Sequence, residues 1–185
     1  MSEEELIKKA RRGKSEAFGA LYDTYLPRIY RFVFLKTSGK EVTEDITHQT
    51  FLKAWQNIRQ YIPKGFPFSS WLYRIAHNLV IDHYRAKKIN IGLDSIEENE
   101  LAFEPENKLD DNLAIAKIKS AIPKLPQEQQ TVIIMKFIEG LSNEEVAAAL
   151  DKSEVTVRVL QHRAIKNLKN LTGENGKNNP KIKEA

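Results

Sequence analysis

Apolar side chains recur at spacings of three and four residues along most of the chain, which is the period of an amphipathic helix. The pattern is clearest over residues 15–33, 43–58 and 66–88, and again from residue 113 onward, while residues 3–12 could form a short first helix. The period of two that marks a half-buried strand is almost absent. The sequence therefore predicts an all-α fold.

Hydroxyl side chains stand where several of these helices are expected to begin. Ser15 and Thr43 precede two of them, and Ser69 or Ser70 precedes a third. A serine or threonine oxygen at this position can accept a hydrogen bond from an N–H of the first turn, so we expect these residues to be N-caps. Pro27 lies within the second helix and predicts a kink or a restart there.

The helix predicted over residues 66–88 has two different faces. At about 100° per residue one face is apolar and carries Leu72, Ile75, Ala76, Leu79 and Val80. A narrower stripe carries Trp71, Arg74, Asn78, Asp82 and Arg85. An indole, two guanidiniums and a carboxamide in a row suit stacking on an unpaired base, contacts to phosphates and hydrogen bonds to a base edge. The alternative is that Trp71 and Tyr73 are core aromatics and the charged groups a solvated face.

Residues 140–171 have the spacing of a helix-turn-helix. Ser142 and Glu145 match a capping box at the start of a short helix, and Ser153 can cap a longer helix after a three-residue turn. Outside its apolar face the longer helix presents Arg158, Val159, His162, Arg163 and Lys166. Such a helix can enter the major groove of DNA. The alternative is an ordinary helical hairpin with a basic, solvated face.

Charge divides the chain into three blocks. Residues 1–93 hold 16 basic and 9 acidic side chains, residues 94–111 hold 1 and 8, and residues 112–185 hold 12 and 8. Two basic blocks around an acidic one indicate two modules that face nucleic acid, joined by a polar linker. Composition leaves open whether that linker is an inert tether.

The remaining composition narrows the protein class. The chain has no cysteine, which excludes a disulfide framework and a thiolate metal site. Its opening residues are acidic, and no apolar run approaches the ~18 residues of a membrane span. We therefore expect a soluble, cytoplasmic protein without membrane insertion.

Three motifs in this order resemble a group IV, or extracytoplasmic-function (ECF), sigma factor of bacterial RNA polymerase. They are TEDI through FLKAW at residues 43–55, FSSWLYRIAHN with Ile81-Asp82 at residues 68–82, and LP through the helix-turn-helix at residues 125–164. The resemblance implies a region 2 helical bundle at residues 1–90, an acidic linker at 91–111, a region 4 helix-turn-helix domain at 112–172 and a flexible tail at 173–185.

The resemblance also implies roles for individual residues. The contact with the core polymerase would involve Asp45, His48, Gln49, Phe51 and Leu52. Single-stranded promoter DNA would meet Trp71, Arg74, Asn78 and Arg85. Duplex promoter DNA would meet Arg158, Val159, His162, Arg163 and Lys166.

The partners implied by the resemblance are core polymerase, through its β′ clamp and β flap, promoter DNA and an anti-sigma factor. No cofactor, metal or catalytic residue is implied. The chain departs from the family pattern at His48 and Gln49, where a glutamine followed by an acid is usual, and at Asp151, where the turn usually has glycine.

Two other functional classes are compatible with parts of the pattern. A helix-turn-helix regulator with an N-terminal partner-binding domain would bind duplex DNA without polymerase. An enzyme would need a recognisable site, but the four histidines are scattered and no glycine-rich phosphate loop is present.

Overall fold

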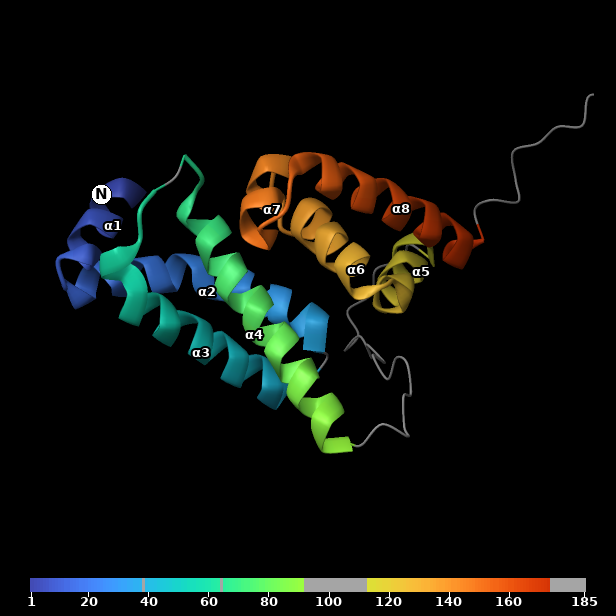
Figure 1. The fold of residues 1–185 in the computed structure, drawn as a ribbon, viewed down its shortest axis with the longest axis horizontal. Coiled ribbons are helices and arrows are strands. Elements are labelled where there is room, and N and C mark those ends of the chain that lie inside the picture. The colour runs from blue at the N-terminus through green and yellow to red at the C-terminus, as the bar shows by residue number, and fades with distance from the viewer. Residues whose placement is uncertain (38, 64, 92–112, 174–185) are drawn as a thin grey trace, which may run out of the picture.

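The computed structural model describes residues 1–37, 39–63, 65–91 and 113–173 (Figure 1). Every regular element within these residues is a helix, and no strand occurs among them. The predicted all-α class is therefore confirmed.

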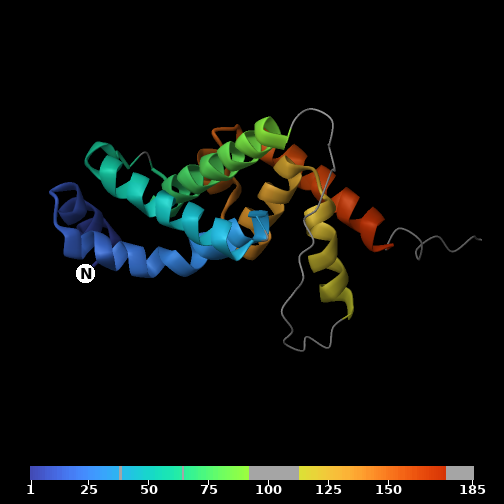
Figure 2. The same ribbon diagram turned by 90° about the horizontal axis from the view of Figure 1, so that it is seen from below.

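The first four helices form one group, called here the N-terminal bundle. It consists of α1 (Glu3–Arg11), α2 (Ser15–Thr37), α3 (Lys40–Asn57) and α4 (Phe68–Ile91), with a 3-10 turn, η1 (Ile58–Gln60), after α3. Helices α2, α3 and α4 pack side by side (Figures 1 and 2). Their buried apolar side chains include Leu21, Ile29, Phe32, Val33, Ile46, Ala54, Leu72, Ala76 and Val80. The apolar face expected on α4 thus lies in the core, with Ile75 partly buried beside it.

The remaining helices form the C-terminal bundle. They are α5 (Leu113–Ala121), the 3-10 turn η2 (Ile122–Lys124), α6 (Gln127–Ile133), the π-helical turn η3 (Ile134–Ile138), α7 (Asn143–Leu150) and α8 (Glu154–Thr172). Helix α8 packs on α5, α6 and α7. The buried residues between them include Val132, Met135, Val146, Val157, Leu160 and Ala164.

Each helix of the helix-turn-helix begins with the N-cap that the sequence predicts. Ser142 Oγ accepts a hydrogen bond from the Glu145 N–H at 3.1 Å, and Glu145 Oε2 accepts one from the Ser142 N–H at 2.6 Å. Ser153 Oγ accepts a hydrogen bond from the Thr156 N–H at 3.1 Å. These bonds satisfy N–H groups that the first turn of each helix leaves without an intrahelical partner.

Two other predicted caps are wrong. Helix α3 begins at Lys40 with Gly39 as its N-cap, and Thr43 is buried inside the helix, where its hydroxyl donates to the Gly39 carbonyl at 2.6 Å. Ser69 and Ser70 lie within α4 and are buried. Helix α3 therefore starts about one turn before the position that Thr43 predicts, and α4 starts at Phe68, ahead of both serines.

A third predicted cap is also wrong, because Ser15 is the first residue of α2 and not the residue before it. Helix α2 continues through Pro27 without a restart. Helix α1 begins with a capping box between Ser2 and Glu5 that the sequence reasoning missed, although its serine and glutamate spacing was the available signal.

The two bundles pack against each other, mainly through α4 and α7 and also through α2 and η3 (Figure 1). The sequence pattern gave no indication of this contact. It brings the helix-turn-helix against the helix that carries the aromatic and basic stripe.

We predict that Asp151→Gly raises the free energy of unfolding by about 1 kcal/mol. Asp151 ends α7 in the left-handed region with a φ of 54°, where glycine has no Cβ penalty. Urea denaturation measures the change. Asp151→Ala is the control, because it removes the same carboxylate from the negative end of the α7 dipole but keeps a Cβ. Equal gains in both variants would contradict the backbone explanation.

Candidate nucleic-acid interface

The stripe predicted on α4 exists, but its members differ in exposure. Asn78, Asp82 and Arg85 are exposed, whereas Trp71 and Arg74 are partly buried. The helix thus presents a carboxamide and a guanidinium to solvent in its middle and later turns. Its first turns lie against other parts of the protein.

Trp71 belongs to an aromatic cluster at the start of α4. Its ring centroid lies 4.8 Å from that of Tyr61 and 5.4 Å from that of Phe68. Tyr73 is fully buried and packs edge-on against Phe32, with centroids 5.4 Å apart. The core-aromatic alternative therefore holds for Tyr73, whereas Trp71 both packs on the core and retains an accessible part.

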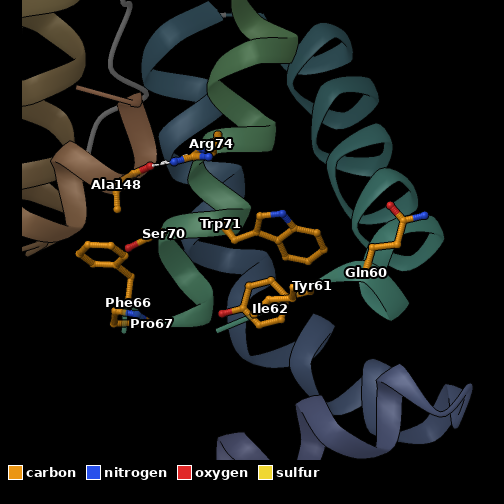
Figure 3. A pocket seen from close by; sticks show the side chains of 9 residues that line it. All are labelled: Gln60, Tyr61, Ile62, Phe66, Pro67, Ser70, Trp71, Arg74 and Ala148. Atoms are coloured by element: carbon orange, nitrogen blue, oxygen red, sulfur yellow. Dashed lines mark hydrogen bonds between the residues drawn. The ribbon is translucent and has the colours of Figure 1, made fainter. Parts of the chain in front are cut away.

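A cavity of about 310 Å³ lies beside Trp71 (Figure 3). The turn between η1 and α4 contributes Tyr61, Ile62 and Phe66, and α4 contributes Trp71 and Arg74. No role was predicted for this turn from the sequence. The signal that could have marked it is the density of aromatic and apolar residues in YIPKGFP, since Ile62 is 64% exposed and Phe66 is 39% exposed.

The C-terminal bundle closes one side of this cavity. Arg74 donates hydrogen bonds from Nε, at 3.1 Å, and from Nη2 to the carbonyl of Ala148 in α7 (Figure 3). Its guanidinium also lies 3.8 Å from the Asp151 carboxylate. In this arrangement the predicted phosphate ligand of the stripe is therefore bound by α7.

A buried carboxylate joins the bundles a short distance away. The Glu139 side chain has no exposed surface, and it accepts hydrogen bonds from Arg31 at 2.7 and 2.9 Å and from the Tyr73 hydroxyl at 2.7 Å. Arg28 donates to the Glu139 backbone carbonyl at 2.9 Å. Burial, followed by the nearby Glu139 charge, raises the pKa of Tyr73. The hydroxyl therefore remains a donor to this carboxylate.

Lys36 forms a second buried polar contact between the bundles. Its Nζ donates to Gln130 Oε1 at 2.6 Å and to the Gln127 carbonyl at 3.3 Å, and its side chain is 1% exposed. Because burial penalises the ammonium, the pKa of Lys36 falls to about 7. On the same interface the pKa of His77 falls to about 4, mainly because of burial and then because of the charges of Lys36 and Lys152.

Helix α3 carries the residues expected to contact a polymerase. Asp45, His48 and Leu52 are exposed, and Gln49 is partly exposed and donates to Asp45 Oδ2 at 2.8 Å. Phe51 is different, since it is 4% exposed and packs on Tyr22 with ring centroids 4.6 Å apart. Phe51 is thus buried in this arrangement, and its expected contact with the polymerase stays a prediction.

Helix α8 exposes all five residues expected to meet duplex DNA. Arg158, Val159, His162, Arg163 and Lys166 are exposed. Arg158 Nη2 lies 3.0 Å from Glu154 Oε2, one turn earlier. The α8 surface is thus accessible while the beginning of the α4 stripe is covered.

Comparison with known proteins assigns both bundles to one family. The profile of sigma-70 region 2 matches residues 21–89, and that of sigma-70 region 4 matches residues 115–168. The ECF RNA polymerase sigma factor SigW of Bacillus subtilis is 32% identical over 85% of this chain and 89% of SigW. The chain belongs to the ECF sigma factors.

Other relatives agree with this assignment. ECF sigma factor BldN of Streptomyces coelicolor is 34% identical over 90% of this chain, which spans 64% of BldN. The solved structure of CnrH in complex with the cytosolic domain of CnrY has a TM-score of 0.69 at 25% identity and covers 91% of this chain and 96% of CnrH. Sigma factor RpoE of Bartonella quintana shares the fold, with a TM-score of 0.65 at 22% identity. The match covers 84% of this chain and 96% of the RpoE chain.

Two further properties concern only the described part of this sigma factor. No helix in it could span a membrane. Among the same residues, no three histidine or acidic side chains are grouped to hold a metal ion.

We predict that Glu139→Gln separates region 2 from region 4. The substitution removes the charge that Arg31 and Tyr73 contact and that Arg28 Nε approaches at 3.7 Å. We expect docking to weaken by about 1–2 kcal/mol, since the side chains of Arg28 and Arg31 are partly exposed. Because the chain has no cysteine, Gln56→Cys and Lys169→Cys can carry a fluorophore pair on exposed positions of the two regions. Energy transfer between the labels measures docking.

The matched control is Glu41→Gln, an exposed glutamate in the first turn of α3. It removes the same charge without touching the interface. Unchanged energy transfer in Glu139→Gln, or an equal loss in the control, would contradict the role given to the buried carboxylate.

We predict that docking of the two regions strengthens as the pH rises from 7 to 9. The pKa of Lys36 is lowered to about 7 when docked, so the separated state binds more protons above that pH, and docking gains up to about 1.4 kcal/mol per pH unit. Below pH 7 the lysine is charged in both states and its slope vanishes. The same labelled chain, titrated between pH 6 and pH 9, measures the effect.

Lys36→Met should flatten this pH dependence, because it retains an unbranched side chain without a titrating group. His77 contributes only below about pH 6.5, where an exposed histidine titrates, and the raised tyrosine pKa values act above pH 10. A slope between pH 7 and 9 that persists in Lys36→Met would show that another group causes it.

Proposed function

We propose that this sigma factor directs core RNA polymerase to promoters, with α3 docking on the polymerase, α4 capturing the melted strand and α8 contacting the duplex. The observation that supports the proposal best is the presence of regions 2 and 4 in order, each with its DNA-facing helix formed. The chain contributes no catalytic group of its own and acts in the cytoplasm, where polymerase and DNA meet.

Strand capture follows from the chemistry around Trp71. A base must leave the duplex stack before its edge can be bound, which costs a few kcal/mol. Stacking on an aromatic side chain returns about 1–3 kcal/mol per base, and the cavity beside Trp71 offers aromatic walls from Tyr61 and Phe66. Asn78 and Arg85 extend the surface along α4 toward further nucleotides.

Arg74 links this step to the arrangement of the two regions. Its Nε and Nη2 groups bind the Ala148 carbonyl of α7, so these two donors can bind a phosphate only after α7 has moved away. In the proposal, region 4 separates from region 2 before strand capture and so frees the whole guanidinium. The polar character of the interface, which includes Glu139 and Lys36, makes such a separation feasible because these groups can be rehydrated.

Polymerase docking is proposed for the exposed face of α3. Asp45, His48, Gln49 and Leu52 lie on that face, and Leu52 is 46% exposed. Phe51 would stabilise this face indirectly, because it packs in the core beneath it against Tyr22. The β flap of the polymerase is the proposed partner of region 4.

Duplex contact is proposed for α8. Arg158 and Arg163 can donate to a guanine edge or to phosphates, and His162 and Lys166 add donors along the same helix. Domain limits are proposed at residues 1–90 and 112–172. The acidic linker at 91–111, apart from Ile91, and the tail from residue 174 lie outside the described residues.

An anti-sigma factor is the proposed regulator. The similar CnrH structure contains the cytosolic domain of CnrY, and RpoE was solved with the anti-sigma factor NepR. Exposed apolar side chains on both regions, including Leu52 and Phe137, offer surfaces for such a partner.

We predict that Asn78→Ala binds core polymerase normally but transcribes about tenfold less from duplex promoters. The exposed carboxamide is a base-edge ligand in the proposal, and one good base contact contributes about 1–3 kcal/mol. A template already mismatched across the melted region should partly restore transcription. Run-off transcription with purified core polymerase measures both effects.

Asn57→Ala provides the control, because Asn57 is an exposed amide at the end of α3, away from the α4 stripe and on another side of the helix from the proposed docking face. It should transcribe like the parent. If Asn78→Ala opened duplex promoters as well as the parent, the stripe would not capture the strand. If the parent bound duplex DNA alone and supported no transcription, a helix-turn-helix regulator would be the better assignment.

A further inference from the structure

The outward face of α8 begins with two apolar residues. Val157, Leu160 and Ala164 face the core and are 0–8% exposed, and at 100° per residue Val155 lies on the opposite side of the helix. Val155 is 68% exposed and Val159, one turn later, is 43% exposed. The first two turns of the proposed recognition helix thus offer branched methyl groups to solvent.

Folding of the isolated domain gains little from valine at these positions. A β-branched side chain is a poorer helix former than alanine because its χ1 freedom is restricted in a helix. An exposed apolar side chain also gains nothing from burial in the free protein. Lysine, glutamate or alanine would serve the isolated domain better at both places.

We infer that Val155 and Val159 pack against C5 methyl groups of thymines in the duplex promoter element. The inference rests on the proposed function of α8. Residues near the N-terminus of a recognition helix face base edges in the major groove. The thymine methyl is the apolar group that a base pair presents there, so it is the natural partner for an exposed aliphatic side chain.

The surroundings of the two valines favour DNA as the occupant. Arg158, His162 and Lys166 share their side of the helix, and all three are exposed. Arg158 Nη2 donates a hydrogen bond to Glu154 Oε2 at 3.0 Å, and Glu154 directly precedes Val155 in the chain. An apolar centre bordered by cationic groups fits a groove whose floor carries methyl groups and whose rims carry phosphates.

Helix geometry limits where the thymines can lie. Side chains at i and i+4 are about 5–6 Å apart, and successive bases on a strand are separated by about 3.4 Å along the helix axis. The two methyl groups should therefore lie within about two base-pair steps of each other. Val155, which sequence reasoning did not include, becomes a specificity-determining residue together with Val159.

The test uses holoenzyme formed from core polymerase and the full chain. Duplex promoters are first selected from a random pool, and each thymine of the selected upstream element is then replaced singly by deoxyuridine. This change removes only the C5 methyl and leaves base pairing intact. At one or two neighbouring positions the parent should bind about three- to fivefold more weakly, as expected for one buried methyl-sized group.

The valine variants assign each methyl to a side chain. Val155→Ala and Val159→Ala should each lose a similar factor on the thymine promoter and should then be insensitive to deoxyuridine at one position. Alanine favours the helix, so these variants should fold. Leu171→Ala, at the far end of α8 and 47% exposed in the parent, is the control and should keep the full sensitivity.

The inference would be overturned by the following results on the selected duplexes and the valine variants. Selected elements that lack thymine, or that tolerate deoxyuridine at every position, would exclude methyl contacts and leave the proposed function intact. Sensitivity that persists unchanged in both valine variants would assign the methyl contact to another group. Failure of the holoenzyme to select any duplex would instead contradict the proposed function itself.

Discussion

The arrangement of the two regions depends on one carboxylate that has no contact with water. Glu139 is compatible with burial only because Arg31 and Tyr73 donate to it and Arg28 binds the adjacent backbone carbonyl. An unpaired carboxylate there would cost several kcal/mol. Satisfying it fixes the end of η3 against α2 and α4, and that position in turn brings α7 onto α4 and the Ala148 carbonyl onto Arg74.

The contact between the regions is stabilised differently from the cores of the regions. Inside region 2, aromatic and aliphatic side chains such as Phe32 and Leu72 are fully buried and gain from leaving water. Between the regions the buried polar groups Glu139 and Lys36 and the partly buried His77 lie beside apolar contacts, since the buried apolar residues of both regions form one continuous cluster. Buried polar groups of this kind can make an interface specific in geometry while its net stability stays modest, which is compatible with the proposed separation of the regions.

The two DNA-facing helices are in different states in this structure. The recognition helix α8 keeps its charged and apolar outward residues accessible. The start of the α4 stripe is covered, because α7 binds Arg74 and closes one side of the cavity beside Trp71. In the proposed function, contact with the duplex and capture of the melted strand therefore make different demands on the arrangement of the regions, and separation is proposed only for the second.

The sequence by itself determined the local features. Helical periodicity gave the all-α fold, the Ser142–Glu145 capping box gave the start of α7, and the order of motifs gave the family, because each depends on residues close together in the chain. Tertiary structure decided the rest. It placed Phe51 in the core and joined Glu139 to Arg31. These outcomes depend on contacts between residues far apart in sequence, whose burial and partners no local pattern specifies.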